Sequence, residues 1–251
     1  MELSHERRGA GEPLVLLHPL GGEWQVWEPI LEGLAAHRDV IALDLPGFGS
    51  SPPLPASTLP TPAALAGAVE AFLRGLGIES AHVAGNSLGG WIALELGARG
   101  AARSVSALSP AGLWPDPLAP NGALAHRLAR TTLPLLLLLA SSAAGRRRML
   151  ASTVGHPERV PAPAARRLVS AYARAPGFEA VNAAMRQGRF LDATSLRVPV
   201  TVAWGELDRL VARHPLEGAS RTVILRDCGH IPVWDDPEAV VRVLLEGSEA
   251  G

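Results

Sequence analysis

Short runs of apolar residues recur along this chain, each followed by a glycine-rich turn and then by a stretch with helical periodicity. This order is typical of repeated strand–helix units on a parallel sheet. Because the runs are almost continuously apolar, we expect strands that are covered on both faces. The predicted strands are Leu14–Leu17, Val40–Leu43, Ala81–Ala84, Ser104–Leu108, Val200–Ala203 and Thr222–Leu225.

Helical periodicity follows several of these runs. Thr61 and Asp236 each stand directly before a proline, and a capping side chain followed by proline is a preferred start of a helix. The predicted helices are Trp24–Ala36, Thr61–Leu76, Leu88–Arg99 and Asp236–Leu245. The predicted fold class is therefore α/β, with a mostly parallel sheet between two layers of helices.

The strand–helix alternation stops after Ala111 and resumes at about Arg197. The segment between, from Gly112 to Leu196, is rich in Leu, Ala and Arg, is broken by prolines, and has no clear strand pattern. We predict a core made of residues 1–111 and 197–251, with residues 112–196 inserted as a helical cap over the sheet. The run Arg146–Arg148 within it is interpreted as a solvated helix face.

Composition excludes several classes of protein. A chain with 47% hydrophobic and 19% charged residues forms a packed domain, and a net charge of −1 favours neither nucleic acid nor a membrane as partner. The absence of lysine removes Schiff-base chemistry, and the single cysteine, Cys228, removes internal disulfides and cysteine-rich metal sites. The charged stretch Met1–Arg8 has no apolar segment behind it, so we expect a cytoplasmic protein without a secretory signal.

The strongest functional motif is Gly85-Asn86-Ser87-Leu88-Gly89, between a predicted strand and a predicted helix. A serine on such a sharp turn holds its hydroxyl clear of the sheet, and glycines are needed around it because side chains would crowd the turn. The helix beginning at Leu88 directs backbone N–H groups at the same point. Ser87 is therefore a candidate nucleophile, although an incidental serine in a glycine-rich turn has the same local pattern.

A nucleophilic serine needs a histidine base and an acid that orients the base. Asp208 and His230 follow Ser87 in the required order, and each lies just beyond the end of a predicted strand. The loop acids Glu206 and Asp227 and the nearby His214 are alternatives that the sequence leaves open. Their positions relative to the strand ends favour Asp208 and His230.

The loop after the first strand reads His18-Pro19-Leu20-Gly21-Gly22. Because Pro19 has no N–H, we expect the N–H groups of Leu20 and Leu88 to form an oxyanion hole. His18 would give the wrong order for a triad, so we interpret it as a structural residue that holds the loop. The candidate lining of an apolar substrate pocket is Trp91, Leu113 and Trp114.

These motifs together resemble the α/β-hydrolase superfamily over nearly the whole chain. The matching segments, in order, are 18–22, 44–50, 85–90, 205–208 and 229–230. The resemblance implies a twisted, mostly parallel sheet, a helical cap inserted after the sixth strand, and a triad of Ser87, Asp208 and His230. It also implies that the first antiparallel strands of the family's sheet are abbreviated or missing here, because the N-terminal part is short.

We therefore predict a hydrolase that cleaves a carboxylic ester, lactone or thioester of a small, largely apolar substrate through an acyl-enzyme. Epoxide hydrolases and haloalkane dehalogenases of this fold use an aspartate at the elbow, and Ser87 argues against both. The alternatives are a cofactor-free haloperoxidase or perhydrolase, a carbon–carbon bond hydrolase, or a non-hydrolytic biosynthetic or binding protein. No metal or organic cofactor is implied, and the expected partner is the small-molecule substrate.

Overall fold

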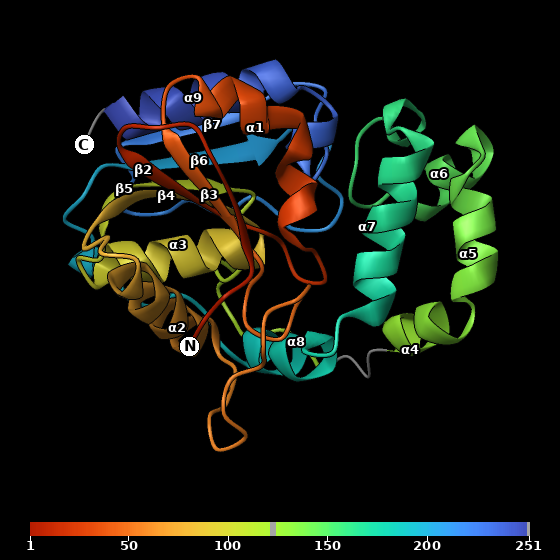
Figure 1. Cartoon of the computed structure of the whole chain (residues 1–251), viewed down its shortest axis with the longest axis horizontal. Coiled ribbons are helices and arrows are strands. Elements are labelled where there is room, and N and C mark those ends of the chain that lie inside the picture. Colours follow the sequence, from red (N-terminus) through yellow and green to blue (C-terminus); the bar gives the residue numbers. More distant parts are fainter. Residues whose placement is uncertain (121–123, 250–251) are drawn as a thin grey trace.

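The computed structural model describes residues 1–120 and 124–249, and in these residues seven strands form one sheet (Figure 1). The order across the sheet is β1-β3-β2-β4-β5-β6-β7. Only β1 runs antiparallel to its neighbour, so the predicted α/β class with a mostly parallel sheet is confirmed. The strands are β1 (His5–Arg8), β2 (Pro13–Leu17), β3 (Asp39–Leu43), β4 (Ala81–Asn86), β5 (Ala102–Leu108), β6 (Val200–Gly205) and β7 (Arg221–Leu225).

Two layers of helices cover the sheet, and the strands alternate their side chains between them. In β2, Val15 and Leu17 join the core cluster under α2 and α3, whereas Leu14 and Leu16 join the cluster under α1 and α9. Figure 1 shows α1 and α9 on one face of the sheet and α2 and α3 on the other. These helices are α1 (Glu28–Ala35), α2 (Pro62–Gly75), α3 (Leu88–Ala98) and α9 (Pro237–Glu249).

Strand β1 is not among the strands predicted from the sequence. Its residues His5-Glu6-Arg7-Arg8 carry no apolar run, yet they pair with β3 in the register His5↔Leu43 to Arg8↔Val40. Arg7 also holds the strand in place through a bidentate salt bridge to Asp39: its Nε donates to Oδ1 at 2.9 Å and its Nη2 to Oδ2 at 2.7 Å. Charged side chains are common on edge strands because they discourage pairing with other chains, and that is why the pattern gave no strand signal.

The helix predicted over Trp24–Ala36 is shorter than expected. A 3₁₀ turn covers Trp24–Trp27, and the α-helix begins at Glu28 with Pro29 in its first turn. A proline has no N–H to donate to a preceding turn, so a continuous α-helix through Pro29 would lose a hydrogen bond. The proline therefore marks the start of α1 rather than its interior.

The segment between β5 and β6 is helical in its described residues, and the insertion follows the fifth strand of this shortened sheet. It contains α4 (Leu124–Thr131), α5 (Leu133–Ala140), α6 (Ala143–Met149), α7 (Ala162–Arg174) and α8 (Phe178–Gln187). Helices α4–α7 share an apolar cluster of their own, whereas Phe178, Val181 and Met185 of α8 pack into the core cluster of the sheet. Figure 1 places α7 between the sheet and α5, so α5 is the outer helix.

None of the helices in the described part of the chain combines the length and the apolar character that a bilayer crossing requires.

Candidate active site

Ser87 lies in a strained turn between β4 and α3. Its φ and ψ angles are 57° and −114°, a region that non-glycine residues rarely adopt. Three backbone hydrogen bonds hold this conformation: the Ser87 N–H donates to Leu108 O at 2.9 Å, and Ser87 O accepts from Trp91 N and Ala111 N at 3.0 Å. Backbone strain of this kind is typical of functional turns, where surrounding contacts enforce it.

The glycines of the motif are required by close approach of backbone to backbone. A Cβ atom on Gly85 would overlap the carbonyl oxygen of Gly89, and a Cβ on Gly89 would overlap that of Leu17. The end of β2 therefore lies directly against the first turn of α3. This contact brings the loop after β2 and the turn at Ser87 together at the carboxyl edge of the sheet, where Leu17 pairs with Gly85.

His230 and Asp208 form a buried pair at the same edge. His230 Nδ1 lies 2.8 Å from Asp208 Oδ2, and both side chains are almost completely buried. The other oxygen of Asp208 accepts from the backbone N–H groups of Leu210 and Val211, at 2.8 and 3.0 Å. Burial by itself raises the pKa of Asp208, but the bond to His230, its charge and the two backbone bonds outweigh this, so the pKa is lowered.

The other acids and the other histidine of this region are placed differently. Glu206 accepts from the backbone N–H of Asp227 at 3.0 Å, and the exposed carboxylate of Asp227 lies 2.8 Å from His156. His214 makes no ion pair or side-chain hydrogen bond to the described residues. Among these alternatives, the structure thus brings together the two residues that the strand-end argument favoured.

Asn86, the neighbour of Ser87, connects the turn to the histidine loop. Its side-chain amide donates to His230 O and to Leu108 O, both at 2.9 Å. His230 Nε2 is buried and makes no hydrogen bond within the described residues. A buried imidazole nitrogen without a hydrogen-bond partner has a lone pair that can take up a proton during catalysis.

The loop after β2 forms a tight turn held by His18. The N–H of Gly22 donates to Pro19 O at 2.9 Å, and Gly21 has a φ of +76°, as the third position of a type II turn requires. His18 is completely buried; its Nε2 accepts from the N–H of Leu45 at 3.0 Å, and Nδ1 lies 2.8 Å from Pro19 O. Burial lowers the pKa of His18 to about 4, so a neutral imidazole holds the loop, as the sequence analysis interpreted it.

Comparison with known proteins places this arrangement in a family. The model of the alpha/beta hydrolase family matches residues 14–243. The chain belongs to the alpha/beta hydrolase family. It is 32% identical over 204 residues to the epoxide hydrolase EphH of Mycobacterium tuberculosis, covering 72% of this chain and 92% of that protein. The family and its relatives make this chain a hydrolase of the α/β type.

Two further likenesses cover different shares of the chain. Over 103 residues it is 42% identical to the pimeloyl-[acyl-carrier protein] methyl ester esterase of Aeromonas hydrophila, covering 38% of this chain and 36% of that enzyme. A crystal structure of a membrane phospholipase A is 27% identical with a TM-score of 0.76, covering 99% of this chain and 84% of that one. Against some other relatives, this hydrolase spans less than a third of their length.

The two tryptophans predicted to line a pocket are packed in the core of this hydrolase. The rings of Trp91 and Trp114 meet edge to face at 5.8 Å, and both are buried. Their indole N–H groups are satisfied by Glu95 Oε1 and by Gly188 O, each at 2.9 Å. Leu113 is partly buried against the same cluster. These contacts suit core residues, and a role in a substrate pocket stays a prediction for all three.

Two aromatic residues of the inserted segment that were not predicted as site residues lie against the loop after β2. A Cβ atom on Gly21 would be 2.9 Å from the Tyr172 ring and 3.3 Å from the Phe178 ring. Tyr172 and Phe178 meet edge to face at 5.0 Å, and the ring of His126 stacks on Phe178 at 4.4 Å. Their distance in sequence from Gly21 hid this contact, and only the fold brings them beside it.

Asp235 is a third residue that was not predicted from the sequence. One of its carboxylate oxygens accepts from Gly229 N at 2.8 Å and from Gly155 N at 2.9 Å; the other accepts from His156 N at 2.8 Å. Gly229 directly precedes His230, so Asp235 ties the histidine loop to the inserted segment. We interpret it as a positioning residue, because it acts on His230 only through the backbone.

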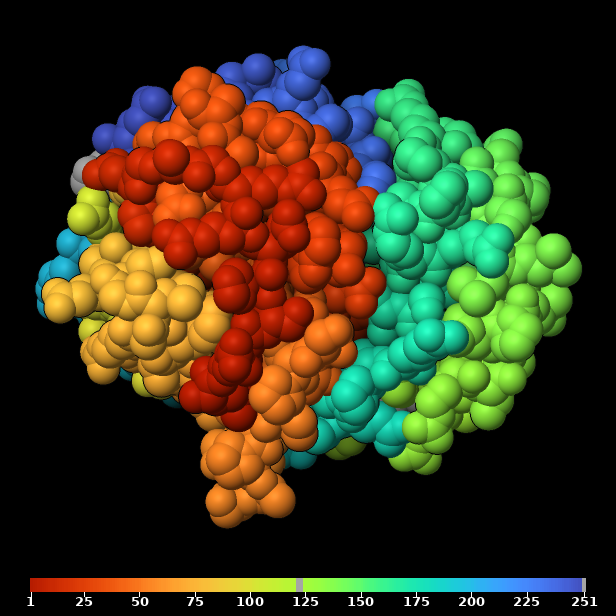
Figure 2. Space-filling model, viewed as in Figure 1, coloured from red at the N-terminus to blue at the C-terminus, as the bar shows by residue number. Residues whose placement is uncertain are grey.

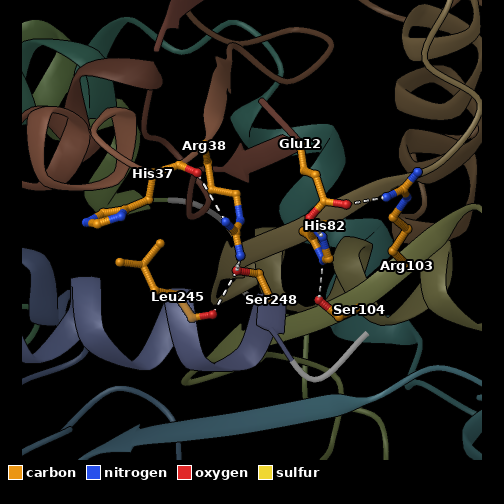
Figure 3. A network of polar contacts seen from close by, with 8 residues as sticks. All are labelled: Glu12, His37, Arg38, His82, Arg103, Ser104, Leu245 and Ser248. Atoms are coloured by element: carbon orange, nitrogen blue, oxygen red, sulfur yellow. Dashed lines mark hydrogen bonds and ion pairs between the residues drawn. The ribbon is translucent and has the colours of Figure 1, made fainter. Parts of the chain in front are cut away.

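A buried serine–histidine contact lies at the opposite edge of the sheet (Figure 3). Ser104 Oγ is 2.9 Å from His82 Nδ1, and His82 Nε2 is 3.5 Å from Glu12, which also binds Arg103 at 2.8 Å. Ser104 is 1% exposed and sits within a regular strand, with neither a strained turn nor a helix beginning beside it. This group joins β4, β5 and the start of β2, and we assign it a structural role.

Proposed function

We propose that the protein is a serine hydrolase that cleaves a carboxylic ester, lactone or thioester of a small, largely apolar substrate. The observation that carries the proposal is the placement of Ser87: a strained turn at the start of α3, joined through Asn86 to a histidine whose Nδ1 is bound to a buried aspartate. A carboxylate that holds Nδ1 leaves Nε2 free to act as the base.

The proposed reaction has two steps. Ser87 Oγ attacks the carbonyl carbon while His230 Nε2 takes its proton, and the N–H groups of Leu20 and Leu88 stabilise the oxyanion. When the tetrahedral intermediate collapses, His230 returns the proton to the leaving alcohol or thiol. Water then attacks the acyl-enzyme, His230 takes a proton from the water, and the acid leaves as Ser87 recovers its proton.

Ester cleavage is favoured over epoxide opening because the elbow residue is a serine. The resemblance assigns an aspartate to that position in epoxide hydrolases, and this chain has Ser87 there although EphH is similar over most of its length. The names of two other similar proteins, a methyl ester esterase and a phospholipase, describe ester substrates. We infer that this chain acts on the same class of bond.

The inserted segment is proposed to select the acyl group. Tyr172 and Phe178 stand beside Gly21, close to where the acyl carbonyl would bind if Leu20 supplies an oxyanion donor. Changing Tyr172 to Ala should therefore alter the ranking of esters by acyl length, with gains of up to ~0.8 kcal/mol per additional buried methylene. Phe72→Ala is the comparison, because Phe72 of α2 is buried in the core away from the candidate site residues, and we expect it to lower stability without reordering the substrates.

The test of the nucleophile combines labelling and turnover. A fluorophosphonate should label the wild-type protein, and Ser87→Ala should lose both labelling and hydrolysis of nitrophenyl esters, by up to about 10⁶-fold. Ser104→Ala is the matched control, since Ser104 Oγ lies 2.9 Å from the ring of a buried histidine, and this variant should keep both labelling and hydrolysis. Labelling that survives in Ser87→Ala and disappears in Ser104→Ala would assign the nucleophile to Ser104, at the opposite edge of the sheet, and would refute this proposal.

A further inference from the structure

The charge of this chain is unevenly distributed. Residues 124–174, which form α4–α7, contain nine arginines and a single acidic residue, Glu158, and so carry a net charge of +8. Because the whole chain carries −1, the remaining residues together carry −9. The net charge of the whole chain is close to zero, and from it we predicted no anionic partner. It is nevertheless the sum of a strongly basic unit, residues 124–174, and an acidic remainder of the chain.

Most of these arginines have no acidic partner. Arg127 pairs with Glu179 and Arg167 with Glu28, while Arg146 donates to the carbonyls at the end of α5. The remaining six are exposed and make no ion pair within the described residues: Arg130, Arg147, Arg148, Arg159, Arg166 and Arg174. Their field is therefore not cancelled by neighbouring carboxylates.

The same unit exposes leucines in a regular pattern. On α5, Leu135, Leu138 and Leu139 are 55%, 70% and 41% exposed, and their spacing of three and four residues puts them on one face. Leu124 and Leu128 of α4 are also exposed and are four residues apart. We call these five residues the leucine face. Figure 1 places α5 on the outer side of the molecule, and Figure 2 shows α4–α6 forming that side of the surface.

Several of the free arginines lie on helices that contact α5. Arg130 ends α4 just before α5 begins, and Arg147 and Arg148 lie on α6 just after α5 ends. An open groove of about 430 Å³ between α5 and α7 is lined by Leu137, Pro163 and Arg166, among others. An exposed apolar helix face with unpaired cations on the neighbouring helices matches an interface that offers hydrocarbon beneath a layer of negative headgroups.

We propose that the leucine face and the arginines around it dock this protein on an anionic phospholipid surface. The apolar part makes lipid a better partner than nucleic acid or an acidic protein segment, because exposed leucines gain nothing from a polyanion in water. The inference does not depend on the proposed hydrolysis, since none of the residues involved belongs to the candidate triad or oxyanion loop.

Vesicle flotation of the full chain tests the proposal. The protein should bind vesicles of phosphatidylcholine mixed with phosphatidylglycerol, bind pure phosphatidylcholine far more weakly, and dissociate as salt is raised. Arg147→Gln with Arg148→Gln should weaken binding about 25-fold, from about fivefold for each charge. The control is Arg226→Gln with Arg242→Gln, two exposed arginines of the core without an ion pair, which should bind as the wild type does.

A second pair of variants tests the apolar contact. Leu138→Gln should weaken binding by about tenfold, whereas Leu59→Gln should not, although Leu59 on the core is 67% exposed, almost the same as Leu138. Glutamine is a good helix former, so α5 should keep its structure, which circular dichroism can verify. Ser87→Ala should bind vesicles normally, which separates docking from catalysis.

Three results would overturn the proposal. The first is equal binding to neutral and anionic vesicles, or none to either at low salt. The second is equal loss in the control and test variants. In the third, the protein binds a soluble polyanion such as polyuridylate as tightly as it binds vesicles, and Leu138→Gln does not change the binding. The surface of α4–α7 would then recognise charge alone.

Discussion

The neutral buried imidazole of His18 makes stability depend on pH in a defined direction. Its pKa is about 4 in the folded protein against 6.5 for an ordinary histidine, because burial disfavours the charged ring. Below pH 6.5 the unfolded chain takes up a proton at this position and the folded chain does not. The folded state therefore loses stability as the pH falls from 6.5 to about 4, and below that the loss stops growing.

The size of the effect follows from the two pKa values. The interval between 6.5 and about 4 corresponds to roughly 3 kcal/mol, since each unit is worth 1.36 kcal/mol. The assay is urea unfolding at several pH values between 7 and 4, with the wild type compared to His18→Gln. Glutamine does not titrate, and its amide oxygen can still accept from the N–H of Leu45.

We expect His18→Gln to be less stable at pH 7 but to lose less stability on acidification, by up to about 3 kcal/mol. Comparing the two slopes removes the contributions of other groups, such as Asp208 and His82, which both proteins share. His37→Gln is the control, because the His37 side chain is exposed, and its slope should equal that of the wild type. Identical slopes in His18→Gln and the wild type would refute the argument that a buried neutral His18 holds the loop.

Three other predictions follow from the site. Gly89→Ala should destabilise the fold by about 1–3 kcal/mol or more in urea unfolding, because its methyl group would meet Leu17 O, whereas Gly75→Ala, with open space around it, should not. Asp235→Asn should lower kcat by about tenfold or more with little change in KM, and an unchanged kcat would remove its positioning role. Burial of Cys228 raises the pKa of its thiol to about 12. We therefore expect Cys228 to resist iodoacetamide at pH 8 until the protein is unfolded, and rapid labelling of the native protein would contradict this.

Local constraints explain how much of this hydrolase could be predicted from sequence. The turn at Ser87 requires glycines within a few residues, and the strands of the sheet are short apolar runs, so both leave patterns that are visible without the fold. Strand β1 has no such sequence pattern, because this edge strand is stabilised by its partner β3 and by the contact of Arg7 with Asp39. Pro29 is present in the sequence, but the predicted helix Trp24–Ala36 does not use it to place the start of α1.

The charge of the α4–α7 unit is visible in the sequence as nine arginines against one acidic residue, but the net charge of the whole chain hides it because the other residues carry −9. Whether those arginines are free could not be read, since Arg127 and Arg167 find partners on other elements while Arg147 and Arg148 do not. Pairing of charges far apart in sequence is a property of the folded surface.

The sequence by itself determined the α/β class, the order of serine, acid and histidine, and the glycines that the elbow needs, because each depends on residues adjacent in the chain. Only the tertiary structure decided which acid meets His230, which side chains of the insertion stand beside Gly21, and that Asp235 holds the histidine loop. These contacts join residues that are distant in sequence or that compete at similar spacing. A linear pattern can favour one competitor by its position beside a strand end, but it does not fix which one comes within 3 Å, because that depends on how the strand ends and the inserted helices pack together.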